Sequence, residues 1–176
     1  MDPPEYARLH LQQALRPLRN LPGAPSWTEP HRWHVTLLFL AAVRREVLPA
    51  LVAGAAAVVA VAPAMQLRLA GGGRFGPVRR PQVAWAGADG DVGALSALAD
   101  GLTVLARGLY LTVEDRPFRP HVTLGRWAPR RAAEGTLVDR LAGYRGPSWP
   151  VTEVRLWHSL LGPVPRYEKV TAWPVG

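Results

Sequence analysis

The tetrapeptide His-Val-Thr-Leu occurs twice in this chain of 176 residues, at residues 34–37 and, 87 positions later, at residues 121–124. In a β-strand, successive side chains point to opposite faces, so the histidine and threonine of each tetrad share one face. The valine and leucine can then pack into a core on the other face. We expect the two strands to lie side by side, with His34, Thr36, His121 and Thr123 converging on one small anionic group.

The order of the predicted elements repeats as well. Hydrophobic periodicity and Pro/Gly breaks predict a helix from residue 2, a strand at 33–40, a helix at 46–62, and strands at 65–69 and 82–86. They then predict a helix at 91–109, a strand at 119–127, a helix at 131–142, and strands at 151–157 and 167–173.

Both halves read helix, strand, helix, strand, strand, which indicates an internal duplication. We therefore expect one domain over residues 1–176, with pseudo-repeats of about 1–88 and 89–176. The expected fold is α+β, in which two lobes with antiparallel-rich sheets surround a central cleft and the helices lie outside.

By the logic of the repeat, a strand is missing at the N-terminus. The strand at 82–86 directly precedes a helix, whereas the first helix begins with Asp2 as N-cap, Pro3 at the first position and Glu5 completing a capping box. Either the natural start lies upstream of Met1, or the protein lacks this strand and leaves a sheet edge open. An open edge favours association with other chains.

Composition narrows the possible chemistry. The chain has no cysteine, which excludes disulfides, thiolate nucleophiles and cysteine-based zinc sites and fits a reducing compartment. The net charge of +8 rests almost entirely on arginine, since Lys169 is the only lysine. Arginine suits phosphate contacts, so a nucleic acid is a candidate partner, although genome composition could produce the same bias.

No membrane or secretory segment is indicated. Residues 1–5 lack the basic and apolar regions of a signal peptide, and the uncharged stretch 47–65 is interpreted as a buried Ala-rich helix. The run of three glycines at 71–73 is not followed by Gly-Lys-Ser/Thr, so the sequence does not support a nucleotide-binding P-loop. We expect a cytoplasmic monomer without a membrane partner.

Two histidines and two hydroxyls that face a groove suit phosphodiester chemistry. An in-line displacement at phosphorus needs a base on the attacking oxygen and an acid on the leaving oxygen, and imidazole titrates near neutral pH, so one histidine can serve each role. Thr36 and Thr123 can donate hydrogen bonds to the non-bridging oxygens. No metal or cofactor is required, and no closely spaced second ligand supports a zinc site.

Other candidates are less specific. Arg119 shares the strand parity of His121, whereas Arg126 has the opposite parity and would face away unless the strand bends. The loop at 71–80 carries arginines that could grip a nucleic-acid backbone or simply be solvated: Arg74, Arg79 and Arg80. Aromatic residues that could stack on bases, or fill the core, are Trp27, Trp33, Phe75 and Trp127. Histidines predicted to be surface or packing residues are His10, His31 and His158.

Both tetrads, with residues 80–87, 116–120, 159–163 and 167–168, resemble the 2H phosphoesterase superfamily. Within it they resemble the RNA 2′,3′-cyclic phosphodiesterases, also called 2′-5′ RNA ligase-like proteins, over nearly the whole chain. Family members usually open with a short apolar strand, which is absent here. A glycine is also common where Ala41 and Ala42 follow the first tetrad.

The resemblance implies a bilobal fold and metal-independent hydrolysis of a terminal 2′,3′-cyclic phosphate on RNA to a 2′-phosphate. It further implies that His34 is the acid that protonates the departing 3′ oxygen and that His121 is the base that activates water. Two alternatives remain open. One is RNA joining through a 2′-5′ linkage, with an RNA 5′ hydroxyl in place of water, and the other is an RNA-end-binding module without turnover.

Overall fold

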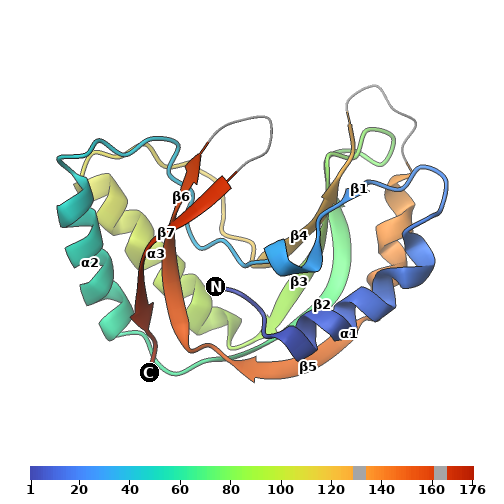
Figure 1. Ribbon diagram of the computed structural model, residues 1–176, viewed down its shortest axis with the longest axis horizontal. Coiled ribbons are helices and arrows are strands. Elements are labelled where there is room, and N and C mark those ends of the chain that lie inside the picture. The colour runs from blue at the N-terminus through green and yellow to red at the C-terminus, as the bar shows by residue number, and fades with distance from the viewer. Residues whose placement is uncertain (129–133, 161–165) are drawn as a thin grey trace.

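The computed structural model describes residues 1–128, 134–160 and 166–176 of the chain (Figure 1). Its helices are α1 (Glu5–Leu15), α2 (Leu48–Ala60) and α3 (Val92–Gly108), and its 3₁₀ turns are η1 (Arg16–Leu18), η2 (Pro30–Arg32) and η3 (Gly135–Leu141). The strands are β1 (Ser26–Trp27), β2 (Gln66–Phe75), β3 (Val83–Gly90), β4 (His121–Arg126), β5 (Arg145–Pro150), β6 (Glu153–Leu160) and β7 (Arg166–Pro174).

The strands form two antiparallel sheets. One has five strands in the order β1-β4-β3-β2-β5, and the other consists of β6 and β7. In Figure 1 the ribbon forms an arch, with α1 and η3 beside the five-stranded sheet and α2 and α3 at the end that holds β6 and β7. The α+β class predicted from the sequence is confirmed.

The core is apolar, and α3 shows how the sequence builds it. Its buried residues recur at helical spacing and form one stripe: Leu95, Leu98, Ala99, Leu102 and Ala106. Burying a leucine side chain contributes about 1.5–3 kcal/mol relative to leaving it in water, so this stripe fixes the helix against its neighbours. No helix in the described residues combines the length and the apolar character that a membrane crossing demands.

The start of the chain differs from the prediction. Pro4, not Asp2, occupies the N-cap position of α1, and no side chain caps this helix. Asp2 instead forms an ion pair with Arg155 of β6, which also pairs with Glu153. The carboxylate is therefore committed to a distant strand and is not available as a cap.

The predicted strand at 33–40 is also wrong as a continuous element. It is reduced to one antiparallel bridge, between Val35 and Val122 of β4. A strand is recognised by the ladder that it shares with its neighbours. In the described residues, β6 has β7 as its one strand neighbour and does not pair with residues 33–40, so the ladder on that side is missing.

The expected loop at 71–80 begins later than predicted, because β2 continues through the glycine run to Phe75. The register of β2 against β3 shifts between Ala70 and Gly73. A β-carbon on Gly73 would lie 2.4 Å from a ring carbon of Trp85, so the glycine makes room for the indole to lie on the strand. Gly73 thus permits close packing against Trp85 and Gly72 against Leu141 of η3, while Gly71, with φ of 65°, adopts the left-handed conformation at the register shift.

Two strands were not predicted, and one predicted helix has a different form. β5 contains Pro147 and Pro150, which argue against a central strand, but β5 lies at the edge of its sheet where proline is tolerated. The two-residue β1 is too short for any periodicity to reveal. Of the helix predicted at 131–142, residues 131–133 lie outside the described residues, and 135–141 form the 3₁₀ turn η3.

Substitution of Gly73 by alanine tests the packing of Trp85. The new methyl group has to displace the indole, so we expect a loss of about 1–3 kcal/mol in the free energy of unfolding. A matched control is Gly143→Ala, because a β-carbon at Gly143 meets nothing within 4 Å. Urea unfolding should leave the control within about 0.5 kcal/mol of the parent protein. Equal stability of both variants would show that Trp85 does not depend on Gly73.

Candidate functional site

The single bridge between Val35 and Val122 brings the two tetrads together. In an antiparallel pair the flanking residues face each other, so His34 lies opposite Thr123 and Thr36 lies opposite His121. The two histidines are then diagonal neighbours, which on a regular antiparallel pair are about 7–8 Å apart. The tetrads are thus adjacent in space although 87 residues separate them in the chain.

Burial follows the alternation expected from the sequence. Val35 and Val122 are 2% and 0% exposed. On the opposite face, His34 is exposed and His121 is half-buried, and each threonine shares the class of its histidine. Neither threonine hydroxyl hydrogen-bonds to another described residue, so both remain available to a ligand.

The two imidazoles are held in the same way. Nδ1 of His34 lies 2.9 Å from the carbonyl oxygen of Arg32, and Nδ1 of His121 lies 2.6 Å from that of Arg119. A carbonyl oxygen can only accept a hydrogen bond, so Nδ1 carries the proton and donates it in both cases. In the neutral ring Nε2 is then the basic nitrogen, and it has no hydrogen-bond partner among the described residues.

The charge state of His121 is biased by its surroundings. Burial lowers the pKa of His121 below the ordinary value of 6.5, although its hydrogen bond to the Arg119 carbonyl acts in the opposite direction. The positive charges of His34 and Arg126 lower the pKa of His121 further. At neutral pH the His121 ring is therefore mostly neutral, the form that can accept a proton.

Arg126 reaches this site because β4 is irregular. The register of β4 against β3 shifts by one residue between Thr123 and Gly125. Such a bulge changes which face the following side chains occupy. Arg126 is exposed, like the polar face of the tetrad, and its charge influences His121. The bend that the sequence prediction required for Arg126 is thus present.

A small cavity of about 90 Å³ borders His121. Phe75, Trp85, Arg119 and Pro120 form its other walls. The edge of Phe75 meets the imidazole of His121, with ring centroids 5.0 Å apart and an interplanar angle of 83°. Arg119 therefore orients His121 through its carbonyl and also lines the adjoining cavity.

His34 has an aromatic neighbour of its own. The rings of His34 and Tyr167 of β7 are 6.4 Å apart between centroids and meet edge to face. The guanidinium carbon of Arg32 lies 5.7 Å from the centre of the Tyr167 ring, within the range of a cation–π contact. The second sheet thus contributes one side chain to the surroundings of the first tetrad.

The family model of the 2′-5′ RNA ligase superfamily matches residues 4–163, which include both tetrads. The chain belongs to this superfamily. The resemblance that the motifs indicated is confirmed.

Three superfamily relatives illustrate the similarity. An RNA 2′,3′-cyclic phosphodiesterase from Thermus thermophilus is 32% identical over 91% of this chain and 79% of the relative. One from Geobacillus stearothermophilus is 28% identical over 85% of this chain but 48% of the relative, so this chain spans about half its length. The crystal structure of E. coli LigT complexed with 3′-AMP gives a TM-score of 0.78 at 27% identity, covering 99% of this chain and 94% of LigT.

Several residues singled out in the sequence do not join the site of this superfamily member. Arg74 donates to Asp139 at 2.8 Å and to the Gly135 carbonyl, so it ties β2 to η3, while Arg79 and Arg80 remain exposed. Three of the aromatic candidates have structural roles: Trp33 and Trp127 are buried, and Trp27 donates its indole N–H to the Arg19 carbonyl.

Of the aromatic candidates, Phe75 has a ring that contacts the imidazole of a tetrad histidine, His121. Trp85 and Tyr167 were not assigned to the site from the sequence. Trp85 lies between Ala84 and Ala86 in a predicted strand, so alternation places its ring on the opposite face from these alanines, which is a weak signal. For Tyr167 no local signal exists, because its proximity to His34 arises from the pairing of β6 and β7.

The described residues also contain no group of three or more His, Cys, Asp or Glu side chains that could hold a metal ion. His10 contacts the hydroxyl of Tyr144 on the surface, and His31 and His158 are exposed. The tetrads therefore contain the two histidines that the fold brings together.

The pKa of His121 can be tested by NMR titration of its imidazole resonances. We expect a pKa below 6.5, and we expect Arg126→Gln to raise it, because removal of a nearby positive charge favours the imidazolium. Arg116→Gln serves as the control, since Arg116 pairs with Glu114 on the surface and should leave His121 unchanged. A His121 pKa at or above 6.5 would contradict the burial argument.

Proposed function

We propose that this protein hydrolyses 2′,3′-cyclic phosphate ends of RNA to 2′-phosphates, without a metal ion. The observation that carries the proposal is the bridge between the tetrads, which sets two imidazoles with unpartnered Nε2 atoms on one face. The two curated relatives described above, both named RNA 2′,3′-cyclic phosphodiesterases, support the choice of substrate.

In the proposed reaction, His121 is the base and His34 is the acid. Nε2 of His121 accepts a proton from water as the water oxygen attacks phosphorus. The bond between phosphorus and the 3′ oxygen breaks, and His34 protonates that oxygen. The products are a 2′-phosphate and a free 3′ hydroxyl.

The environment of His121 supports this division of roles. A base must be unprotonated before the reaction, and burial lowers the pKa of His121, which favours that form at neutral pH. His34 is more exposed than His121. A positive charge on His34 also lowers the pKa of His121.

Thr36 and Thr123 are proposed to bind the substrate. Each lies opposite the histidine of the other tetrad, and each can donate a hydrogen bond to a non-bridging phosphate oxygen. Preorganised donors of this kind stabilise the charge that gathers on these oxygens as the new bond forms. The arginine-rich composition supports attraction of a polyanionic substrate.

The proposal extends to location, oligomeric state and a second candidate activity. The protein is proposed to act in the cytoplasm, consistent with the absence of cysteine, and as a monomer, because both tetrads come from one chain. The second candidate activity is RNA joining through a 2′-5′ linkage, which the family name favours. It uses the same two histidines, with an RNA 5′ hydroxyl in place of water.

The proposal is tested by the rate of ring opening of a 2′,3′-cyclic nucleotide or a short RNA that ends in one. His34→Ala and His121→Ala should each lower kcat by roughly 10²–10⁴-fold, the usual contribution of general acid-base catalysis. EDTA should leave the rate unchanged. His10→Gln is the control, since His10 lies on α1 against Tyr144.

Near-normal turnover by both tetrad variants would refute the catalytic assignment. Incubation with matched RNA fragments distinguishes the two activities, because hydrolysis leaves two fragments and joining yields one longer product. Tight, salt-sensitive binding of an RNA end that stays intact would instead identify a binding module.

A further inference from the structure

The two tetrads are part of a longer repeat, because an arginine stands two positions before each histidine. Residues 32–37 read Arg-Trp-His-Val-Thr-Leu, and residues 119–124 read Arg-Pro-His-Val-Thr-Leu. The carbonyl groups of Arg32 and Arg119 orient the two imidazoles, but this contact uses only the main chain. The proposed hydrolysis gives the guanidinium groups of these two arginines no role.

The side chain of Arg32 lies on the same face as His34. Burial alternates along this segment, since Trp33 and Val35 are 1% and 2% exposed, whereas Arg32, His34 and Thr36 are exposed. Such alternation is typical of an extended chain with one buried face. Arg32 thus extends the polar face of the first tetrad, although it is the last residue of η2.

Tyr167 of β7 positions the guanidinium of Arg32 beside His34. The guanidinium carbon lies 5.7 Å from the centre of the Tyr167 ring, and the imidazole of His34 meets the same ring with centroids 6.4 Å apart. One ring therefore contacts both a permanent positive charge and the histidine proposed as the acid. Tyr167 is 48% exposed, so a ligand can reach this arrangement.

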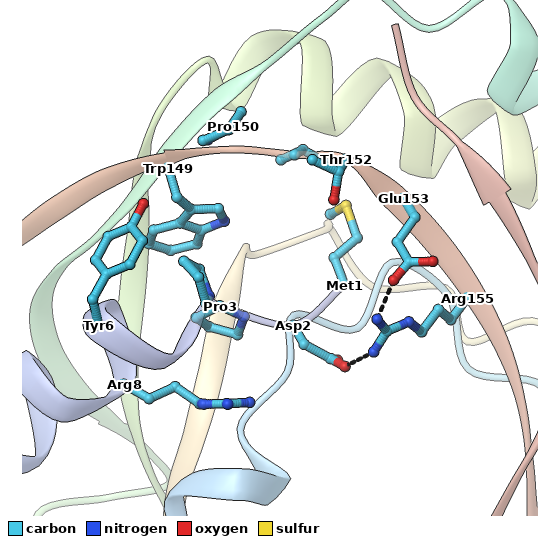
Figure 2. A pocket seen from close by; sticks show the side chains of 12 residues that line it. Met1, Asp2, Pro3, Tyr6, Arg8, Trp149, Pro150, Thr152, Glu153 and Arg155 are labelled. Atoms are coloured by element: carbon cyan, nitrogen blue, oxygen red, sulfur yellow. Dashed lines mark hydrogen bonds and ion pairs between the residues drawn. The ribbon is translucent and has the colours of Figure 1, made fainter.

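Arg32 is not paired with a carboxylate. Arg155 shows the opposite case, because it pairs with both Asp2 and Glu153 (Figure 2). Among the residues that the structure describes, no ion pair includes Arg32. A guanidinium presents its N–H donors in a planar fork that matches two oxygens of a phosphate. A tyrosine ring attracts the charge without accepting these N–H groups in the plane of the fork, so Arg32 keeps donors for an anion.

The direction of the proposed reaction decides which group of the RNA lies near Arg32. In an in-line displacement the attacking and leaving oxygens lie on opposite sides of phosphorus. Water enters beside His121, so the departing 3′ oxygen and the ribose that carries it lie beside His34. The RNA strand continues from the 5′ carbon of that ribose. Its first phosphodiester is therefore the next anion on the side of His34.

The second arginine of the repeat has different surroundings. Arg119 borders the cavity beside His121, together with Phe75 of β2 and Trp85 of β3. Figure 1 shows β2 and β7 in opposite halves of the arch, so the aromatic neighbours of the two arginines come from opposite sides. Hydrolysis brings only water to the side of His121. The phosphodiester of the substrate strand therefore lies near Arg32 and not near Arg119.

We propose that Arg32, positioned by Tyr167, binds the phosphodiester on the 5′ side of the terminal nucleotide and thereby makes the protein select RNA ends over cyclic mononucleotides. This inference rests on the hydrolysis proposed above and narrows its substrate class. A cyclic mononucleotide with a free 5′ hydroxyl lacks this phosphodiester, so Arg32 contributes nothing to its binding. Arg32 is then a specificity-determining residue, and Tyr167 is a positioning residue.

The test compares Arg32→Gln with the parent protein on two substrates. One is a short RNA that ends in a 2′,3′-cyclic phosphate, and the other is a 2′,3′-cyclic mononucleotide with a free 5′ hydroxyl. Glutamine keeps the main-chain carbonyl that orients His34, so kcat/KM for the mononucleotide should stay within about twofold of the parent value. For the RNA, kcat/KM should fall by roughly tenfold or more, because a charge-assisted contact is lost.

Salt dependence tests whether the lost contact is one to a phosphate. For the RNA, the slope of log kcat/KM against log salt concentration should become shallower by about 0.7 in Arg32→Gln, as expected for one phosphate contact to a single strand. Arg107→Gln is the charge-matched control, since Arg107 lies on α3 and pairs with Asp115. It should leave the rates for both substrates unchanged.

Two substitutions test the role of the Tyr167 ring. Tyr167→Phe keeps an aromatic face for the guanidinium and should retain the preference for RNA. Tyr167→Leu removes that face, so it should lower kcat/KM for the RNA more than for the mononucleotide. Equal effects of both variants on the two substrates would contradict the positioning of Arg32 by the ring.

Three outcomes of the Arg32→Gln experiment would overturn the proposal. Equal losses on both substrates would mean that the side chain serves the reaction centre or the fold. An unchanged rate and salt slope for the RNA would mean that it binds no phosphodiester. Turnover of neither substrate by the parent protein would refute the proposed hydrolysis itself, and this inference with it.

Discussion

The antiparallel bridge between Val35 and Val122 is the contact on which the proposed chemistry depends. It is made by two buried valines, so the interior anchors it while the polar partners on the opposite face stay accessible. Because side chains alternate along a strand, fixing one valine fixes the neighbouring histidine and threonine as well. One apolar contact thereby places four polar groups.

Backbone carbonyls orient the two histidines in the same way, whereas burial makes their environments different. Each imidazole donates Nδ1–H to a carbonyl two residues earlier, and this leaves the same nitrogen free in both rings. The rings differ in their surroundings, since His121 is half-buried beside Phe75 and influenced by Arg126, whereas His34 is exposed beside Tyr167. Two identical tetrads can thus take different protonation states without any difference in local sequence.

The features that depend on local periodicity could be predicted from the sequence. The repeat of the tetrads predicted which side chains share a face, and helical spacing predicted α2 and α3 within a few residues. Features set by tertiary contacts were not accessible. The glycine run was interpreted as a loop because its partner, the Trp85 ring, is ten or more residues away, and Arg74 was placed in a basic loop because Asp139 is distant in the chain.

The first tetrad shows the limit most clearly. Its residues have strand character, yet in the described residues they form a single bridge to β4, and no second strand pairs with them. A periodic pattern shows that a segment is able to form a strand, but pairing with other strands decides whether it forms one. The same reasoning explains Arg126, whose accessible position depends on a bulge that parity alone cannot reveal.

The carbonyl contacts of the two histidines also bear on how such a site can change over evolutionary time. The acceptors at Arg32 and Arg119 belong to the main chain, so the identity of those two side chains is irrelevant to the tautomer of either ring. Lineages could therefore exchange both arginines while inheriting the same pair of oriented imidazoles.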